Sequence, residues 1–225
     1  MFVSDAHPIV IAVDGTSGSG KSTNSKIIAR TLGFKYVDTG AMYRTLAWFC
    51  LKNQVDLNEE TAIAGAVDSW DARLNEADGS LRLEVGGYYP EKEIRTEEIS
   101  GCVSAVAANP AVRAWMKMTQ RSCIDFGSLV MEGRDIGSNI FPDSPFKFYV
   151  DANLAERETR RAAEGVNEDL AARDKMDSER KTNPLIIPDG AVCISTSGMT
   201  PDQSSSLMME HIRRIAQENK IPLPA

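Results

Sequence analysis

The sequence predicts a three-layer α/β fold, with helices on both faces of a central parallel sheet. Short apolar runs rich in β-branched residues alternate with segments of helical periodicity, as expected when crossover helices connect buried parallel strands. The first apolar run leads through a glycine-rich loop into a helix. With 225 residues and 42% hydrophobic content, the chain is large enough to form one sizeable domain with a real core.

The amino-terminal elements follow the strand, loop and helix order of such a fold. Residues 9–13 (IVIAV) have the length and composition of a strand buried on both faces, and residues 22–32 are helical in pattern. Gly33 stands where a helix commonly ends in a left-handed residue. Residues 34–38 then predict a second strand, and residues 40–52 predict a second helix.

The middle of the chain has a different pattern. Residues 80–85 (SLRLEV) alternate, which places Leu81, Leu83 and Val85 on one face, and an Ala-Asp-Gly turn signal precedes them. We therefore expect a small antiparallel insertion over about residues 71–95.

The α/β alternation resumes after a helix-rich stretch. Asn109 and Pro110 suit the N-cap and first positions of a helix over residues 111–126. Residues 128–135 and 146–152 then predict two further strands of the sheet.

A polar segment separates these strands from the last strand. Asn153 and Glu156 predict a capping box at the start of a helix, and residues 157–180 carry so many charges that they predict a solvated helical arm. Residues 191–196 predict the last strand, and residues 220–225 should be loosely held. The final helix begins with three cap signals, which are Thr200, Pro201 and Gln203.

The loop after the first strand matches G-x-x-x-x-G-K-[ST] at every fixed position. Glycines let the backbone curl so that successive N–H groups point at an anion, and the next helix adds the positive end of its dipole. In such a P-loop, Lys21 reaches the β- and γ-phosphates of ATP or GTP and Ser22 ligates Mg²⁺. The residues expected at this nucleotide site are Gly15, Thr16, Ser17, Gly18, Ser19, Gly20, Lys21, Ser22 and Thr23.

Composition and charge restrict the classes of partner. A net charge of −7 and a pI near 5.0 argue against a broad electrostatic grip on nucleic acid. We expect no membrane span, because no apolar run approaches roughly 18 residues, and no signal peptide. The four cysteines are scattered without a C-x-x-C pair, which favours reduced thiols in a cytoplasmic protein. The absence of an exposed heptad pattern favours a monomer.

Three groups of polar residues indicate what happens to the γ-phosphate. Two of them follow strands, where open α/β sheets bind ligands, and the third lies on the polar arm. Arginines can hold a second phosphoryl group bidentately and stabilise a loose transition state. The groups are Thr39 with Arg44, Glu132 with Arg134 and Asp135, and Arg173 with Asp177 and Arg180.

Eight motifs extend this pattern from Ile9 to about Asn219. In chain order they are VDGTSGSGKST, DTGAMYR, EIRTEEIS, VSAVAANPAVR, EGRDIGSNIFPDSPFKFYVDA, ERETRRA, RDKMDSERKTNPL and ISTSGMTPDQ. In these motifs the chain resembles the bacterial-type cytidylate kinases, which are nucleoside monophosphate kinases of the P-loop class. GRDIG followed by FPD, together with RDxxDSxR, is far more specific than the P-loop alone.

The resemblance implies a P-loop NTPase-type sandwich that phosphorylates CMP and dCMP with ATP, giving CDP and dCDP by direct in-line transfer. It implies a single domain over residues 1–225. The expected divisions are a core of about residues 8–38, 101–156 and 181–219, a monophosphate-binding insertion of about 39–100 and a lid of about 157–180.

The resemblance also implies roles for single residues. Ser104, Arg113 and Asp135 would recognise cytosine, since a carboxylate accepts from its exocyclic amine but repels the carbonyl of uracil. By the same resemblance, Arg44, Arg134 and Arg180, together with Lys21, would hold the transferred and acceptor phosphates. Arg173 and Asp177 would lie near the sugar of CMP, and Thr39 would also contact CMP. Arg157 and Arg161 would close over ATP.

The implied metal is Mg²⁺, held by Ser22 and, through water, by Asp14 and Glu132. Asp14 suits a supporting role behind the site equally well. No strong general base is needed, because the second pKa of the acceptor phosphate is about 6. Instead, the enzyme must align two nucleotides, screen their repulsion and exclude water, and closure of the lid would serve this.

Two other classes of function stay open at this point. A kinase for UMP, dTMP or a hydroxylated metabolite would share the P-loop, but the set of Ser104, Arg113 and Asp135 argues against it. A regulatory nucleotide-binding protein or GTPase-like switch would need a base-reading motif such as N-K-x-D, which the sequence lacks.

Overall fold

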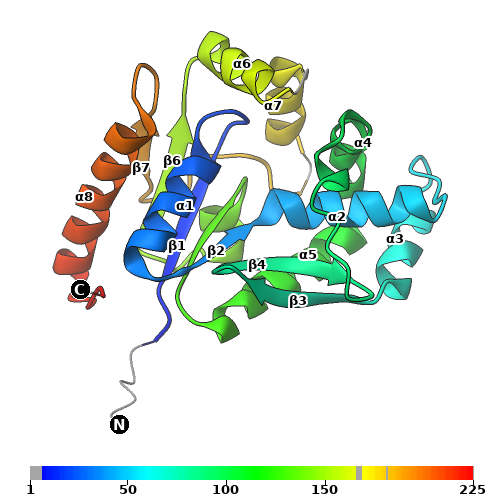
Figure 1. Cartoon of the computed structure of the whole chain (residues 1–225), viewed down its shortest axis with the longest axis horizontal. Coiled ribbons are helices and arrows are strands. Elements are labelled where there is room, and N and C mark those ends of the chain that lie inside the picture. The colour runs from blue at the N-terminus through cyan, green and yellow to red at the C-terminus, as the bar shows by residue number, and fades with distance from the viewer. Residues whose placement is uncertain (1–6, 166–168, 181, 225) are drawn as a thin grey trace.

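A seven-stranded sheet forms the centre of the computed structural model, which describes residues 7–165, 169–180 and 182–224 (Figure 1). The strand order is β3-β4-β2-β5-β1-β6-β7, and neighbours are parallel except for the antiparallel β3–β4 pair. The predicted central parallel sheet is therefore confirmed. Its strands are β1 (Val10–Gly15), β2 (Lys35–Asp38), β3 (Ala72–Ala77), β4 (Ser80–Val85), β5 (Leu129–Gly133), β6 (Phe146–Asp151) and β7 (Val192–Ser195).

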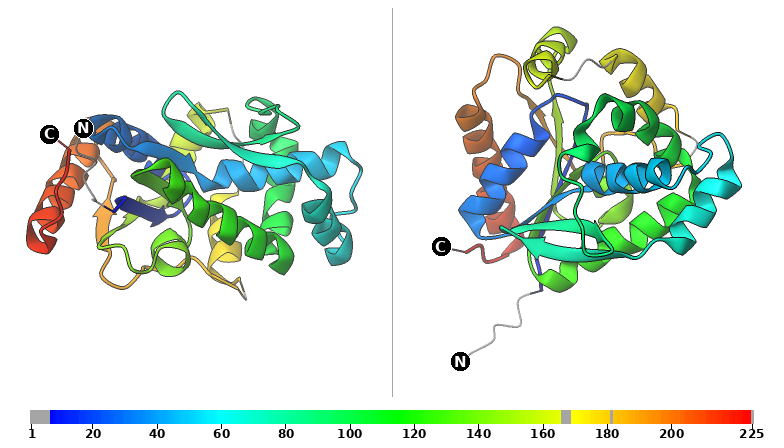
Figure 2. Two further views of the ribbon diagram at one scale, coloured as in Figure 1. Left: turned by 90° about the horizontal axis from the view of Figure 1, so that it is seen from below. Right: turned by 45° about the vertical axis from the view of Figure 1, so that its right-hand side comes forward.

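Helices cover both faces of this sheet, which confirms the three layers (Figures 1 and 2). The helices are α1 (Lys21–Leu32), α2 (Thr39–Lys52), α3 (Glu60–Ser69), α4 (Glu97–Ala108), α5 (Pro110–Ser122), α6 (Leu154–Ala163), α7 (Leu170–Ser178) and α8 (Pro201–Asn219). Three short turns are helical as well, namely η1 (Glu93–Arg95), η2 (Cys123–Phe126) and the π-type turn η3 (Ile136–Ile140). Within the described residues, no helix is long and apolar enough to span a membrane.

Two hydrophobic cores lie on opposite faces of the sheet. Because successive side chains of a strand point to opposite faces, Ile11 and Val13 of β1 enter one core while Val10 and Ala12 enter the other. The first core is closed by α1 and α8, and the second by α2, α3, α4 and α5. As predicted, β1 is buried on both faces, and this double burial fixes the position of the loop that follows it.

The predicted antiparallel hairpin is present and is joined to the central sheet. Strand β3 pairs with β4 as expected, and Leu81 and Leu83 are buried. However, β4 also pairs in parallel with β2 through Tyr36 and Val37. The hairpin therefore extends the edge of the central sheet, because its apolar face completes the core beneath α2.

Several predicted helix boundaries are confirmed. Gly33 ends α1 with a φ of 67°, Asn109 caps α5 by accepting from the backbone N–H groups of residues 111 and 112, and Thr200 with Gln203 forms a complete capping box on α8. The α-helix predicted over residues 111–126 is too long, since it ends at Ser122 and continues as η2.

The capping box predicted at α6 forms only in part. The Asn153 side chain accepts from the backbone N–H of Glu156 at 2.9 Å. The Glu156 carboxylate, however, accepts from the Asn153 side-chain amide and from the backbone of Gly198, whereas the Asn153 N–H donates to Ser197. Glu156 thus joins α6 to the β7–α8 loop instead of closing the box.

The polar segment is helical and mostly exposed, as its composition predicts, but a few of its side chains are buried. It forms two helices, α6 and α7, whose Arg157 and Asp177 side chains are buried; residues 166–168 of the expected arm lie outside the described residues. The tail is also held more firmly than predicted, because Ile221 and Leu223 pack against the core. Charge alone does not identify the buried positions of the polar segment, since Arg157 and Asp177 are buried in ion pairs.

Candidate active site

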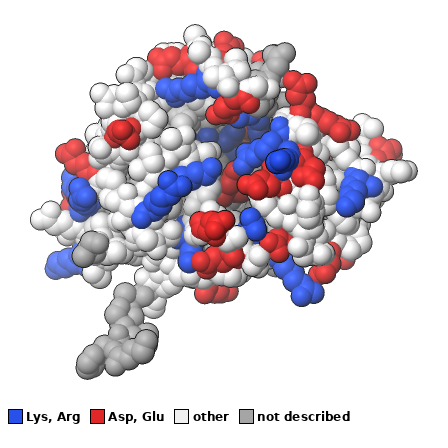
Figure 3. Space-filling view, in the orientation of Figure 1, with Lys and Arg blue, Asp and Glu red and all other residues white. Residues whose placement is uncertain are grey.

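A pocket opens at the carboxyl ends of β1, β2 and β5, where the sequence predicts the ligand to bind. Lys and Arg side chains gather in a hollow of the molecular surface beneath α6 and α7 (Figure 3). The pocket is lined by residues of the P-loop, of α2, α4 and α5, and of the lid helices. These are Ser17, Gly18, Lys21, Ser22, Asp38, Thr39, Gly40, Tyr43, Arg44, Arg95, Val103, Ser104, Ala107, Arg113, Glu132, Gly133, Arg134, Asp135, Arg161, Arg173, Asp177 and Arg180.

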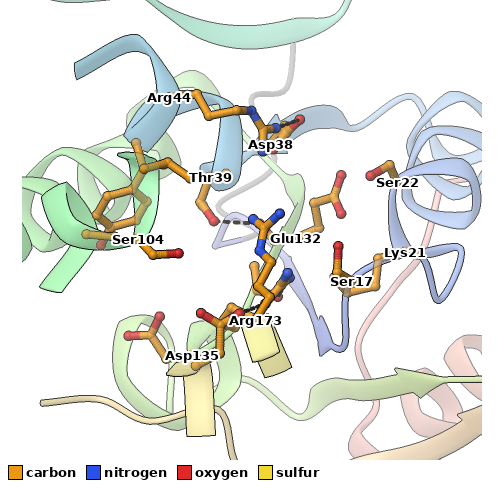
Figure 4. A pocket seen from close by; sticks show the side chains of 18 of the residues that line it. Ser17, Lys21, Ser22, Asp38, Thr39, Arg44, Ser104, Glu132, Asp135 and Arg173 are labelled. Carbon is orange, nitrogen blue, oxygen red and sulfur yellow. Dashed lines mark hydrogen bonds and ion pairs between the residues drawn. The ribbon is translucent and has the colours of Figure 1, made fainter. Parts of the chain in front are cut away.

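The pocket has two ends (Figure 4). Lys21 and Ser22 of the P-loop lie on one side of the view, and Ser104 and Asp135 lie on the other. Arg173 lies between them. A ligand that filled the pocket would therefore touch the phosphate loop with one part and the Ser104–Asp135 end with another.

The P-loop is held in shape by contacts within the protein. At Gly15 a Cβ atom would lie 1.9 Å from the carbonyl oxygen of Val150, and φ is +143°, so only glycine fits there. The Thr16 hydroxyl donates to Asp151 at 2.5 Å, and the Ser19 hydroxyl donates to the Thr16 carbonyl at 2.9 Å. These bonds within the protein support the curve of the loop.

Lys21 lies folded along the loop, with its ammonium group donating to the Thr16 carbonyl. Burial, and then the nearby Arg134, lowers the pKa of Lys21 to about 7, while Glu132 opposes this shift. A phosphate at the loop would supply the missing opposite charge and favour the protonated amine. Lys21 is therefore placed to bind an anion, and a bound anion would in turn stabilise the protonated form of Lys21.

Glu132 lies buried at the end of β5, beside the P-loop. The Tyr36 hydroxyl donates to its carboxylate, and the Thr39 hydroxyl donates to its backbone carbonyl at 2.7 Å. Burial, followed by the charge of Asp38, raises the pKa of Glu132. The carboxylate and the Ser22 hydroxyl line the same pocket and offer the oxygen ligands that Mg²⁺ prefers, so the residues present fit this ion.

Asp14 is fully buried and does not line the pocket. Its two carboxylate oxygens accept from the backbone N–H groups of Ile136 and Gly137, each at 2.7 Å. Burial raises the pKa of Asp14 to about 6, and these two hydrogen bonds oppose the shift. Of the two roles expected for Asp14, the geometry supports the structural one, because the side chain anchors η3 and does not line the pocket.

Ser104, Arg113 and Asp135 come from three different elements and meet at the end of the pocket away from the P-loop. Arg113 donates to Asp135 at 2.6 Å, and both side chains are buried. Arg113 also donates to the Ala107 carbonyl at 3.4 Å, and its guanidinium lies 5.8 Å from the centre of the Tyr43 ring. The three residues thus form a polar end with fixed donor and acceptor groups.

Asp177 connects two arginines in the middle of the pocket. One carboxylate oxygen accepts from Arg134 at 2.7 Å, and the other accepts from Arg180. Burial would raise the pKa of Asp177, but the guanidinium groups of Arg134 and Arg180 hold it below its ordinary value. The ionised carboxylate keeps both guanidinium groups close together, where they can act on a shared anion.

Arg157 and Asp174 fasten the lid helices to the P-loop. Arg157 donates to the Ser17 carbonyl at 3.1 Å, to Asp174 at 2.6 Å and to the Ala152 carbonyl at 2.9 Å. Arg157 is buried and lines neither the pocket nor the groove described next. The expected contact of Arg157 with ATP stays a prediction. The position of the side chain does not favour it, because the guanidinium supports the P-loop from outside the pocket.

A groove continues from the P-loop past α6 to the start of α8, lined by Arg160, Arg161, Thr196, Met199 and Pro201 among others. Arg160 donates to the Thr196 hydroxyl at 2.9 Å and to its carbonyl at 3.0 Å. The Thr196 hydroxyl donates in turn to the P-loop at the Ser19 carbonyl, at 2.8 Å. Arg161, an expected ATP contact, lines both the groove and the pocket.

Asp38, the N-cap of α2, holds two further arginines at the pocket. It lies 3.5 Å from Arg44 and 3.0 Å from Arg95, and accepts from the Ala41 N–H at 2.8 Å. Burial would raise the pKa of Asp38, but Arg44 and then Arg95 hold it below its ordinary value. Arg95 follows the hairpin, so this element also contributes to the pocket.

Most of the residues expected from the sequence line the pocket, the groove or both. The exceptions are Asp14 and Arg157, which support the site from behind, and Gly15 and Thr16, which shape the loop. Sequence reasoning missed several contributors, namely Tyr36, Asp38, Tyr43, Arg95, Arg160, Asp174 and Thr196. Asp38 and Tyr43 stand inside DTGAMYR, and Asp174 inside RDKMD, so their motif membership could have found them.

Comparison with known proteins agrees with this arrangement. The family model of cytidylate kinases matches residues 11–214. This chain belongs to the cytidylate kinase family. Every expected site residue lies within that match. The relatives include the cytidylate kinase of Caldanaerobacter subterraneus subsp. tengcongensis, which is 39% identical over 92% of this chain and 95% of its own length, and that of Symbiobacterium thermophilum, 38% identical over 92% and 96%.

Cytidylate kinases from other bacteria are similar over comparable lengths. That of Geobacillus thermodenitrificans is 37% identical and covers 90% of this chain and 95% of its own length. The family match therefore includes the P-loop, the Ser104–Asp135 end and the lid helices together.

Proposed function

We propose that the chain is an ATP-dependent kinase of CMP and dCMP, producing CDP and dCDP. The observation that carries this proposal is the buried Arg113–Asp135 pair, which lies in the same pocket as a complete P-loop. One end suits a triphosphate and the other suits a base with a donor beside an acceptor. Membership of the cytidylate kinase family supports the same substrates.

The donor nucleotide would occupy the P-loop and the groove that leads to α8. The loop N–H groups and Lys21 would hold the phosphates, and Arg160, Thr196 and Met199 would line the path of the nucleoside. Arg161 is placed where the groove meets the pocket, close to the transferred group.

Ser22 and Glu132 would hold Mg²⁺, Glu132 through water. The ion usually keeps several waters and takes its other ligands from the substrate phosphates, so a dedicated protein cage is unnecessary. When bound, Mg²⁺ neutralises charge on the β- and γ-phosphates. The protein would hold Glu132 in position for this ion through hydrogen bonds from the hydroxyl groups of Tyr36 and Thr39.

The acceptor nucleotide would lie between the two ends, with its cytosine at Ser104, Arg113 and Asp135. The sugar would lie near Thr39, Arg173 and Asp177, and the phosphate among Arg44, Arg134 and Arg180. These guanidinium groups would align the two phosphates for in-line attack and screen their repulsion. The acceptor phosphate is already mostly dianionic at neutral pH, because its second pKa is about 6, so no general base is required.

The helices α6 and α7 would act as a lid over both nucleotides. Their contacts to the P-loop run through Arg157 and Asp174, and Arg134 meets the lid residue Asp177. Arg173 and Arg180 would therefore reach the phosphates only when the lid has closed over both nucleotides. This order of events limits transfer of the phosphoryl group to water. We further expect a cytoplasmic monomer that binds no nucleic acid, in keeping with the net charge of −7.

A coupled assay of ADP formation tests the proposal, with ATP, Mg²⁺ and CMP, dCMP, UMP, AMP or dTMP in turn. We expect activity concentrated on CMP and dCMP. Activity on a different monophosphate would contradict the base assignment while leaving the P-loop assignment in place. Nucleotide binding without transfer to any of the five would contradict the kinase proposal itself.

A further inference from the structure

Two parallel contacts join α5 to the turn η3. Arg113 of α5 donates to Asp135 at 2.6 Å, and Lys117, one helical turn later, donates to the side-chain oxygen of Asn139 at 2.7 Å. The side-chain amide of Asn139 then donates to Asp135 at 2.9 Å, at the same oxygen, Oδ2, that accepts from Arg113. Four side chains thus form a connected network beneath the expected cytosine site.

Lys117 determines which way the Asn139 amide points. An ammonium group only donates hydrogen bonds, so the amide oxygen of Asn139 must face Lys117. The NH₂ group then faces Asp135 and donates to it. The Asp135 carboxylate only accepts, so it favours the same orientation from the other side. Without Lys117 the amide would lose the partner that anchors its oxygen, and its contact with Asp135 would be held less firmly.

The backbone beneath this network is fixed independently. The N–H groups of Asn139 and Ile140 both donate to the Asp135 carbonyl, at 3.0 and 3.2 Å. Asp14 holds the start of the same turn through Ile136 and Gly137. Since the main chain is held in this way, the orientation of the Asp135 carboxylate depends on the side chains that contact it.

These contacts leave one oxygen of Asp135 for a ligand. Oδ2 already accepts two hydrogen bonds, from Arg113 and Asn139, whereas the described part of the chain offers none to Oδ1. Asp135 lines the pocket, and an acceptor oxygen that is held still there suits an exocyclic amine and repels a carbonyl. A carboxylate that could rotate would make this distinction less sharply.

We propose that Asn139, oriented by Lys117, is a positioning residue that sets the preference for cytosine over uracil by holding the Asp135 carboxylate in place. This inference rests on the proposed function, because it assigns base recognition to Asp135. It adds to that function two residues that themselves need not touch the nucleotide.

A double-mutant cycle tests the proposal. The ratio of kcat/KM for CMP to that for UMP is measured in wild type, Asn139→Ala, Asp135→Asn and the double variant. We expect Asn139→Ala to lower the ratio by about 3- to 10-fold, the range of one net hydrogen bond, mainly through a higher KM for CMP. If Asn139 acts through Asp135, it should have no further effect in the Asp135→Asn background.

Two lysine variants provide a matched pair. Lys117→Met removes the group that orients Asn139 and should lower the ratio by a smaller factor, about 2- to 5-fold. Lys147→Met removes the same charge from another lysine near η3, which donates to the Pro142 carbonyl at 2.8 Å and not to Asp135, and should leave the ratio unchanged. The KM for ATP should stay constant in all these variants.

Two results for Asn139→Ala would overturn the proposal. One is an unchanged ratio, which includes an equal loss of kcat/KM for CMP and UMP. The other is an undiminished effect in the Asp135→Asn background, which would exclude positioning through Asp135. If Asn139→Ala does not fold, Lys117→Met decides, and a ratio equal to that of Lys147→Met contradicts the proposal. A wild type without preference for CMP would refute the proposed base recognition instead.

Discussion

The two ends of the pocket are built in different ways. The P-loop end comes from consecutive residues, and its main binding groups are backbone N–H groups and Lys21. The opposite end is assembled from α4, α5 and the segment after β5, and its groups are side chains held by buried ion pairs. The first end suits any nucleoside triphosphate, since every one carries the same phosphates, whereas the second end presents a pattern that one base can match.

This difference indicates that phosphoryl transfer and the choice of acceptor depend on different ends of the pocket. Changes at the P-loop end should affect transfer with every acceptor, and changes at the Asp135 end should affect the choice of acceptor. Asp177 stands between them, because it holds Arg134 of the core and Arg180 of the lid region in one bridge. Mutations at each place can therefore test whether transfer and acceptor preference are affected separately.

The largest effect is expected at the P-loop. Lys21→Met removes the cation that we propose binds the β- and γ-phosphates, and we expect kcat to fall by about 10³-fold, similar to the loss of other groups that stabilise transition-state charge. The loss should be equal with CMP and dCMP, and the melting temperature should stay close to that of wild type. A coupled assay measures kcat with each acceptor, and a thermal melt measures the melting temperature. If Lys21→Met altered the preference among acceptors, the two ends of the pocket would not have separate roles.

The bridge between the two ends should matter for stability. Asp177→Asn leaves two partly buried arginines without their carboxylate, and we expect a loss of about 3 kcal/mol in the free energy of unfolding at pH 7. The folded state holds the pKa of Asp177 below its ordinary value, so the ionised carboxylate stabilises the fold above about pH 4. That contribution disappears as the pH falls through the folded-state pKa.

Urea unfolding of wild type and Asp177→Asn at several pH values measures this difference. The gap between the two proteins should be widest near neutral pH and should shrink on acidification below about pH 4. A gap that is constant across this range would show that Asp177 stabilises the fold by some means other than its charge.

A smaller effect is expected on the choice of base. Asp135→Asn replaces an acceptor-only carboxylate with an amide that can also donate to the carbonyl of uracil. We expect the preference for CMP over UMP to fall by about 10- to 100-fold, in the range of one good base contact, with the KM for ATP unchanged. If the preference survives, Asp135 does not read the base.

The smallest effect is expected in the groove beside the P-loop. Arg160→Met removes the bonds to Thr196 that support the groove, and we expect the KM for ATP to rise by about 5-fold. The KM for CMP should not change. Initial rates with each substrate varied in turn provide the test, and a parallel rise of both KM values would mean that Arg160 supports the whole pocket.

The sequence predicted the elements that depend on local signals. The apolar strand, the glycine loop and the caps at Gly33, Asn109 and Thr200 are each determined by a few neighbouring residues, and the structure has them where predicted. Features that depend on distant contacts were missed or misjudged. The hairpin joins β2 because of its buried face, and Arg157 of the mostly exposed polar segment is buried because it reaches Ser17.

The same distinction applies to the site. The P-loop residues follow from their spacing, but the grouping of Ser104, Arg113 and Asp135 came from the family resemblance. Spacing along the chain does not show that α5 faces η3, so neither the Asn139–Asp135 bond nor the contact of Arg95 with Asp38 was predicted. Asp14 shows the converse, since its position beside the P-loop suggests a metal role, whereas its hydrogen bonds go to η3.

The most direct test of the division between the two ends is the binding of CMP and UMP in the absence of ATP, measured by titration calorimetry. Because the Arg113–Asp135 pair is held by contacts within the protein, CMP should bind at least about 10-fold more tightly than UMP, as expected for one base contact. Equal affinities for CMP and UMP would contradict the account, since the base would then be read by something other than the preformed end of the pocket.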